Sequence, residues 1–208
     1  TGVARVRTPL ELNPENYSMK NYKIALLAGD GIGPEIMREA VKIFHVIEER
    51  NDVSFTLTDA DFGAAAYFKC GDPFPEATKA ICDAADAILK GPIGLSHEES
   101  KKIPVDMQPE RGALLPLRRR YNTFANFRPV FLPKALGHFS PLKPEIIGEG
   151  IDLIMVRELV GGLYFGEKEV GVNARGLRYV KETLEYDEEQ IARIMHEALQ
   201  LSMRRKKV

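Results

Sequence analysis

Cysteine is scarce in this sequence, where Cys70 and Cys82 are the only two. Neither stands at a metal-ligand spacing from another cysteine or from a histidine, and a disulfide is not implied. Two isolated thiols are typical of a protein that is kept in a reducing compartment. The cysteine pattern therefore argues against a disulfide-stapled scaffold and against a cysteine-based metal centre.

Long apolar runs and a surplus of positive charge are missing too. No stretch approaches the roughly 20 residues that a membrane-spanning helix needs, and no signal peptide is visible. The formal net charge is −1 at pH 7, which predicts neither a nucleic-acid partner nor attachment to an anionic membrane. We expect a cytoplasmic protein, or an organellar one from which a targeting segment was removed.

The composition is that of an ordinary globular protein. Hydrophobic residues make up 44% and charged residues 28% of the 208 residues, enough for one large domain or two modest ones with a real core. Residues 1–20 show no hydrophobic periodicity. We interpret them as a leader or vector remnant, with Met19 as the candidate native start, and exclude them from the fold. An organised N-terminal extension is the less favoured alternative.

An apolar run followed by alternating glycines opens the periodic part of the chain. Residues 22–33 read YKIALLAGDGIG, which predicts a buried strand that enters a tight turn. Pro34 suits the first position of a following helix, whose predicted apolar stripe comprises Ile36, Ala40, Ile43 and Ile47. Such a turn exposes backbone N–H groups to an anion. The glycines do not match GxGxxG, so a purely structural turn is an equal alternative.

Strands and helices continue to alternate as far as residue 94, which predicts an α/β layer. Residues 95–107 are polar and irregular and are predicted to form a loop. Glu110 is then expected to begin a helix that carries two leucines and an arginine, Leu114, Leu115 and Arg118. A strand follows, TFANFRPVF, in which alternation places Asn126 and Arg128 on one face.

Arginines from two elements beside a leucine pair describe a pocket for a small anion with an apolar end. The planar fork of a guanidinium can hold a carboxylate with two hydrogen bonds. The alternative is structural: residues 118–120 would be a solvated, basic helix end and the leucines would be core. Further on, the apolar run GIDLIMV ends in Arg157 and Glu158, and charges at the tip of a buried strand tend to mark a site or its rim.

The last third of the chain contains a glycine-rich turn, a charged segment and a helix. Tyr164 lies in the turn, and its sequence context alone is typical of a half-buried strand tyrosine. Residues 166–186 are predicted to form two short strands joined by a polar turn. Asp187 is predicted to cap the last helix, whose apolar stripe comprises Ile191, Ile194, Met195, Ala198 and Leu201.

Three motifs in this order, QPERGALLPLR, FANFRP and VRELVGGLYFGE, resemble the 3-isopropylmalate dehydrogenases. These belong to a wider family of decarboxylating 2-hydroxyacid dehydrogenases that includes isocitrate and tartrate dehydrogenases. The resemblance runs from Tyr22 to Val208. It implies an isopropylmalate-dehydrogenase-like layered α/β fold, with a first domain over 21–125 and a second, smaller α/β domain over 126–208. A protruding β arm, 166–186, would join two subunits as a homodimer.

The implied activity is the NAD-dependent oxidative decarboxylation of 3-isopropylmalate to 4-methyl-2-oxopentanoate in leucine biosynthesis, with Mg²⁺ or Mn²⁺. The resemblance assigns substrate binding to Arg118, Arg128, Arg157, Leu114 and Leu115, and the proton-donation step to Tyr164. It assigns the cofactor to Gly29, Asp30, Gly31, Ile32, Gly33 and Glu110. The leucine pair favours isopropylmalate, because the extra carboxylate of isocitrate or the hydroxyl of tartrate would be desolvated there without a partner.

The family's catalytic lysine, metal-binding aspartates and adenine loop would all lie beyond Val208. No metal ligand is therefore expected within this chain, and the first sheet would lack strands. Our hypothesis is that the chain is the N-terminal portion of such an enzyme and is inactive alone. The alternatives are a non-catalytic family member that serves assembly, and a sister dehydrogenase that acts on tartrate, malate or isocitrate.

Overall fold

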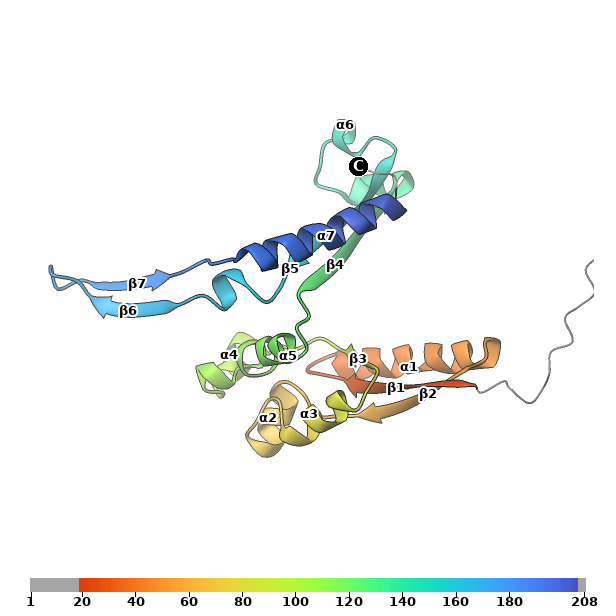
Figure 1. Ribbon diagram of the computed structural model, residues 1–208, viewed down its shortest axis with the longest axis horizontal. Helices are drawn as coiled ribbons and strands as arrows, with labels where there is room; N and C mark the ends of the chain where they lie inside the picture. The colour runs from red at the N-terminus through yellow and green to blue at the C-terminus, as the bar shows by residue number, and fades with distance from the viewer. Residues whose placement is uncertain (1–18, 206–208) are drawn as a thin grey trace, which may run out of the picture. The chain divides into compact units, whose positions relative to one another are not determined.

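The computed structural model describes residues 19–205, which form two compact units that divide between Ala113 and Leu114 (Figure 1). The expected leader falls almost entirely on residues 1–18, outside the described residues. The predicted division after residue 125 differs from this one, because it assigns the helix that begins at Leu115 to the first unit. No helix within residues 19–205 combines the length and the apolar character needed to cross a membrane.

A three-stranded parallel sheet forms the centre of the first unit. Its strands are β1 (Lys20–Leu27), β2 (Val53–Asp59) and β3 (Ala87–Lys90), in the order β2-β1-β3. The central strand buries four consecutive residues, Ile24 to Leu27, with exposed fractions from 0% to 7%. A strand covered on both faces reads as a continuous apolar run. The α/β layer predicted from the sequence is confirmed, and its sheet is parallel.

Three helices accompany this sheet: α1 (Gly33–Arg50), α2 (Ala64–Cys70) and α3 (Glu76–Asp83). The predicted apolar stripe of α1 is wrong. Met37, Val41 and Phe44 pack against Ile24 and Leu26 of β1, whereas Ile36 and the other isoleucines of the stripe are exposed. Helix α1 has apolar residues on two sides, and only contact with the sheet decides which side is buried.

The segment from 95 to 107 is more regular than predicted. It contains α4 (His97–Ser100) and a 3₁₀ turn, η2 (Val105–Met107). Ser96 and Glu99 form a capping box at the start of α4, in which each side chain bonds to the backbone of the other. The sequence signal was present, because Ser-x-x-Glu is the signature of that motif.

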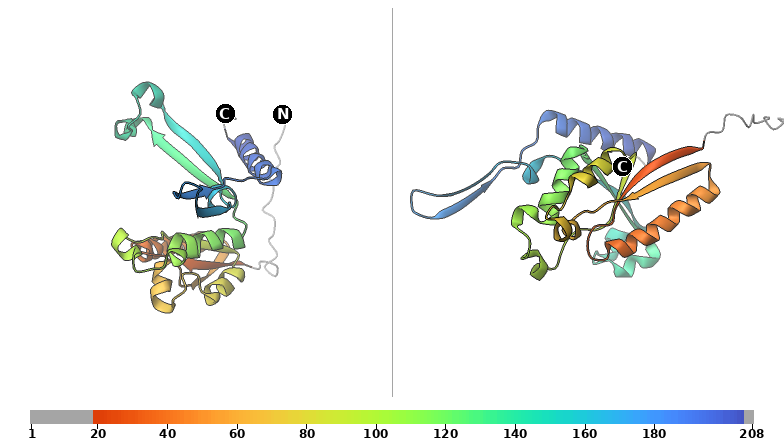
Figure 2. Two further views of the ribbon diagram at one scale, coloured as in Figure 1. Left: turned by 90° about the vertical axis from the view of Figure 1, so that its left-hand side faces the viewer. Right: turned by 90° about the horizontal axis from the view of Figure 1, so that it is seen from below.

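A long antiparallel ribbon organises the second unit, which begins with α5 (Leu115–Arg120). The ribbon pairs β4 (Ala125–Pro133) with β5 (Gly150–Glu158), and the turns η4 (Lys134–Phe139) and α6 (Pro144–Ile147) lie at its far end (Figure 2). Helix α7 (Glu188–Arg204) packs against β5. Asp187 caps α7 and forms a capping box with Gln190, as predicted.

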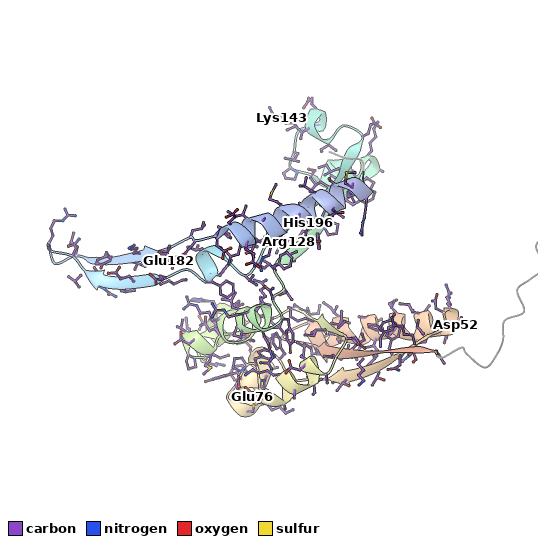
Figure 3. All side chains as sticks on the ribbon, in the orientation of Figure 1. Asp52, Glu76, Arg128, Lys143, Glu182 and His196 are labelled. Atoms are coloured by element: carbon purple, nitrogen blue, oxygen red, sulfur yellow. The ribbon has the colours of Figure 1, made fainter. Side chains whose placement is uncertain are left out.

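A second ribbon projects from the same unit (Figure 1). It pairs β6 (Lys168–Val172) with β7 (Arg178–Glu182), and Glu182 lies near its base in Figure 3. The short 3₁₀ turn η5 (Gly162–Tyr164) precedes it. The predicted pair of short strands is therefore confirmed, and the pairing of this arm with a second subunit stays a prediction.

Candidate functional site

The end of β5 directs two adjacent charges to opposite sides of the ribbon. Successive side chains of a strand alternate between its two faces. The carboxylate of Glu158 faces α7 and forms an ion pair with Arg193, with 3.0 Å between Oε1 and Nη2. Arg157 consequently lies on the other face, which we call the arginine face.

The register of the ribbon places two more polar residues on the arginine face. Asn126 on β4 lies directly opposite Arg157, and Arg128 lies opposite Met155. Residues that face each other across an antiparallel pair share a side of the sheet. The Nε of Arg128 donates a hydrogen bond to Oδ1 of Asn126, with a length of 2.7 Å. The alternation in the sequence predicted this proximity of Asn126 and Arg128.

Arg118 of α5 belongs to the same electrostatic cluster. Burial lowers the pKa of the Arg118 guanidinium, the positive charges of Arg157 and Arg128 lower it further, and Tyr164 acts in the opposite direction. The guanidinium of Arg157 lies over the ring of Tyr164, 5.9 Å from its centroid, a cation–π arrangement. The structure thus brings together the three arginines and the tyrosine that the sequence singled out.

The three positive charges of this cluster have no carboxylate partner among residues 19–205. Within the described part of the chain, neither Arg118, Arg128 nor Arg157 forms an ion pair with a carboxylate. Like charges held together raise the free energy of the folded state unless an anion joins them. The cluster is therefore suited to bind a small, multiply charged anion.

The two predicted apolar residues accompany Arg118 along one helical segment. Leu114 and Leu115 precede it by four and three residues, the spacings that put side chains on one helix face. Both leucines are half-buried. The helical segment begins at Pro109, one residue before the predicted start at Glu110. Its first part, Pro109–Leu114, is a π-helix, which α5 continues. Single π turns are frequent at functional sites.

The glycine turn of the first unit is pressed against the loop after β3. A Cβ on Gly29 would lie 2.0 Å from the carbonyl oxygen of Pro92, and one on Gly33 would lie 2.1 Å from that of Ala28. Gly31, between them, has open space within 4 Å of its Cβ position, and Ile32 is 59% exposed. Gly29 and Gly33 are therefore required for close packing of the backbone, whereas the tip of the turn at Gly31 is accessible.

The side chain of Asp30 is engaged in the structure of the first unit. It is 5% exposed, and its carboxylate accepts hydrogen bonds from the backbone N–H groups of Ala64, Ala65 and Gly94 at 2.8–3.1 Å. The backbone of Asp30 is engaged as well: its N–H donates to the carbonyl oxygen of Pro92 at 2.9 Å, and its carbonyl oxygen accepts from the N–H of Gly33 at 2.8 Å. Asp30 therefore holds the turn in shape. Glu110 is exposed, and its Oε1 lies 3.4 Å from the Cβ position of Gly94, which links it to the same loop.

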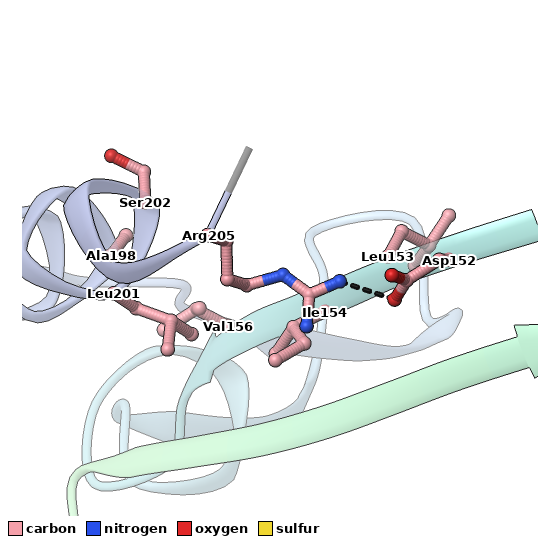
Figure 4. Close-up of a pocket in the computed structure, with 8 residues that line it drawn as sticks. All are labelled: Asp152, Leu153, Ile154, Val156, Ala198, Leu201, Ser202 and Arg205. Carbon is pink, nitrogen blue, oxygen red and sulfur yellow. Dashed lines mark hydrogen bonds and ion pairs between the residues drawn. The ribbon is translucent and has the colours of Figure 1, made fainter. Parts of the chain in front are cut away.

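A hollow that the sequence did not predict lies between β5 and α7. It has a volume of about 580 Å³ and is lined by Asp152, Leu153, Ile154, Val156, Ala198, Leu201, Ser202 and Arg205 (Figure 4). Arg205 and Asp152, which both line the hollow, form an ion pair.

Within residues 19–205, no three His, Cys, Asp or Glu side chains converge on a point that could hold a metal ion. His196 is exposed on α7 (Figure 3).

Comparison with known proteins decides the family. Residues 23–208 match the sequence model of the isocitrate/isopropylmalate dehydrogenase family. The chain belongs to this family. Its relatives include the 3-isopropylmalate dehydrogenases of Campylobacter jejuni, 42% identical over 91% of this chain, and of Haemophilus influenzae, 43% identical over 91%. This chain covers 51% and 52% of those two proteins, so it spans about half the length of the curated relatives it matches.

Solved structures of the family show the same fold over a similar extent. The isocitrate dehydrogenase of Methylococcus capsulatus matches with a TM-score of 0.66 and 26% identity, covering 88% of this chain and 48% of that one. A β-decarboxylating dehydrogenase of Thermococcus kodakarensis matches with a TM-score of 0.57 and 25% identity over 88% of this chain and 46% of that one. The architecture is therefore that of part of an isocitrate/isopropylmalate dehydrogenase.

Proposed function

We propose that this chain is the N-terminal portion of a 3-isopropylmalate dehydrogenase that oxidises and decarboxylates its substrate with NAD. One observation carries the proposal: three guanidiniums that have no carboxylate partner among the described residues form one cluster, in which Arg157 lies over Tyr164. The helix that supplies Arg118 also carries two half-buried leucines. The curated relatives named as 3-isopropylmalate dehydrogenases support it.

The arginine cluster would bind the two carboxylates of the substrate. Each charge-assisted hydrogen bond from a guanidinium contributes roughly 1.5–3 kcal/mol. The leucine pair would meet the isopropyl group, and burying three carbons contributes about 2 kcal/mol. The third carboxylate of isocitrate would lose its hydration beside Leu114 and Leu115 without gaining a partner, so we favour isopropylmalate over isocitrate.

Tyr164 would act after the oxidation. Loss of CO₂ from the oxo acid breaks a carbon–carbon bond and leaves the electron pair on the enolate, whose carbon must then receive a proton. Tyr164 is 52% exposed and lies beside Arg157, so its hydroxyl is accessible to a molecule held by the cluster. We assign it the donation of that proton.

The glycine turn would face NAD, which accepts the hydride when bound. The residues present fit such a role at the tip of the turn, where a Cβ at Gly31 would meet no neighbour within 4 Å and Ile32 is 59% exposed. A glycine turn that leads into a helix can bring its backbone close to an anionic group. Glu110 would lie near the nicotinamide. Among the described residues, no group of three His, Cys, Asp or Glu side chains could hold Mg²⁺ or Mn²⁺.

The arm would supply the contact between two subunits of a cytoplasmic homodimer. Val170, Val172 and Val180 are 64–67% exposed on this two-stranded ribbon. A ribbon of two strands is marginal alone, and its exposed valines would be covered in a dimer. Analytical ultracentrifugation of the full-length protein tests this: a monomer with an intact arm would contradict it.

An assay of the complete reading frame tests the proposed activity. NAD reduction is measured with 3-isopropylmalate, isocitrate, tartrate and malate, each with Mg²⁺ and with Mn²⁺. We expect kcat/KM for isopropylmalate to exceed the others by about tenfold or more, since one misplaced polar group costs at least 1–3 kcal/mol. Equal or better turnover of another acid would overturn 3-isopropylmalate as the substrate. Robust turnover by residues 1–208 alone would overturn the proposal that this chain is only a portion of the enzyme.

A further inference from the structure

We propose that Asn126 is a positioning residue of the anion site: it orients Arg128 while adding no charge to the arginine face. The inference rests on the proposed function. Asn126 contacts two of the arginines. It lies opposite Arg157 across the ribbon, and its side chain accepts a hydrogen bond from Arg128.

The hydrogen bond fixes how Arg128 can bind a ligand. Its Nε donates to Oδ1 of Asn126 at 2.7 Å, so that side of the guanidinium is occupied. The two terminal nitrogens keep their N–H groups, which form the end-on fork that matches a carboxylate. Arg128 is exposed, and a long exposed side chain without such a bond would occupy many rotamers.

An asparagine at this position is unexpected on structural grounds. Asparagine is depleted in β-strands because its side chain competes for backbone hydrogen bonds. In this ribbon its amide bonds to a side chain instead. An aspartate would hold Arg128 more strongly, because the hydrogen bond would join two charges. The neutral amide therefore provides the acceptor that Arg128 needs without a negative charge that would compete with the substrate.

The substitution Asn126→Asp should affect stability and ligand binding in opposite directions. Asn126→Asp would relieve the repulsion among Arg118, Arg128 and Arg157 and raise the melting temperature of the full-length protein. The same carboxylate would repel a dianionic ligand and raise KM for 3-isopropylmalate by about 10- to 100-fold, since like-charge contacts cost several kcal/mol. A residue with a merely structural role would move both quantities in the same unfavourable direction.

The experiment compares Asn126→Asp, Asn126→Ala and a matched control, Asn51→Asp. Asn51 is exposed at the end of α1 in the first unit, where its side-chain amide donates to the carbonyl oxygen of Ile47, so the control adds the same charge outside the ribbon that carries the arginine face. We expect Asn126→Ala to lower the melting temperature slightly and to raise KM less than Asn126→Asp does. Asn51→Asp should leave KM within about twofold, because exposed charges are screened.

A second readout does not depend on dehydrogenase activity. Inorganic sulfate is titrated in a thermal-shift assay as a probe dianion. Wild type and Asn51→Asp should be stabilised, and Asn126→Asp should lose that response. Unchanged KM and an unchanged sulfate response in Asn126→Asp would overturn the inference. A wild-type protein that is stabilised by sulfate and inactive on isopropylmalate would instead refute the proposed substrate and leave the role of Asn126 supported.

Discussion

Glu158 and Arg193 form an ion pair that joins β5 to α7, and Glu158 also holds the loop that follows the strand. Its Oε2 accepts hydrogen bonds from the N–H groups of Val160 and Gly161 at 2.9 and 2.7 Å. The Glu158 side chain is 8% exposed. One carboxylate therefore anchors both the helix and the start of the turn that leads to Tyr164.

The guanidinium of Arg193 is equally constrained. Its Nη1 donates to Oδ1 of Asn122 at 3.2 Å, and its centre lies 4.6 Å from the centroid of the Phe124 ring. The Nε is buried and has no hydrogen-bond partner. Since Arg193 is already incompletely satisfied, the loss of Glu158 would leave a largely buried cation without compensation.

Glu158→Gln is therefore expected to destabilise the protein by about 3 kcal/mol, the typical cost of breaking one side of a buried ion pair. Urea unfolding of the full-length protein measures it. Glu149→Gln is the matched control, because the Glu149–Lys134 pair is 87% and 65% exposed. Exposed pairs contribute about 0–1 kcal/mol. Equal losses in the two variants would contradict this role of Glu158.

Asp30→Asn is expected to lower stability by about 2 kcal/mol, because the neutral side chain replaces one oxygen acceptor with a donor that faces backbone N–H groups. Asp30→Ala removes all three hydrogen bonds and should cost more. Asp52→Asn is the control, since Asp52 is exposed after α1 (Figure 3). Thermal unfolding compares the three. If Asp30→Asn lowers the melting temperature no more than Asp52→Asn does, the hydrogen bonds of Asp30 would not stabilise the first unit.

Gly29→Ala and Gly31→Ala separate packing from ligand binding in the glycine turn. Both glycines have positive φ, 76° and 56°, so both alanines cost roughly 1 kcal/mol of backbone strain. Only at position 29 would the new Cβ collide with a backbone oxygen, that of Pro92. We expect Gly29→Ala to unfold at clearly lower urea concentration. Gly31→Ala should fold, and a raised KM for NAD would reveal contact with the cofactor.

The sequence predicted the elements of this chain better than the faces they bury. The buried run of β1 and the alternation around Asn126 and Arg128 are local signals, because strand periodicity is only two residues. The choice between the two apolar sides of α1 is not local. It depends on which side meets β1, where Met37 packs and Ile36 does not.

The candidate site also contains residues that local sequence signals identified and residues that they did not. Arg118, Arg128 and Arg157 were recognisable from motifs, yet nothing near Glu158 in the sequence pointed to Arg193, 35 residues later. The π turn at Pro109–Leu114 was also missed. The hydrogen bonds of an α-helix and a π-helix differ in span by one residue, and a segment of six residues is too short for periodicity to separate them.

Leu115→Ser tests the source of substrate selectivity. The change shortens an apolar side chain that precedes Arg118 by three residues and offers a hydroxyl in its place. We expect kcat/KM for 3-isopropylmalate to fall by about tenfold, in line with roughly 1.5 kcal/mol of lost apolar contact. The value for malate, which lacks the isopropyl group, should stay within about twofold, because no contact with its carboxylates is removed.

The ratio of the two kcat/KM values is the decisive quantity, because a general loss of folding lowers both alike. Leu115 is half-buried, whereas Leu117 is 8% exposed, so Leu117→Ala serves as the control for damage to packing. That control should reduce stability by about 2–5 kcal/mol and leave the ratio unchanged. An unchanged ratio in Leu115→Ser as well would show that the apolar end of the substrate is recognised elsewhere in the protein.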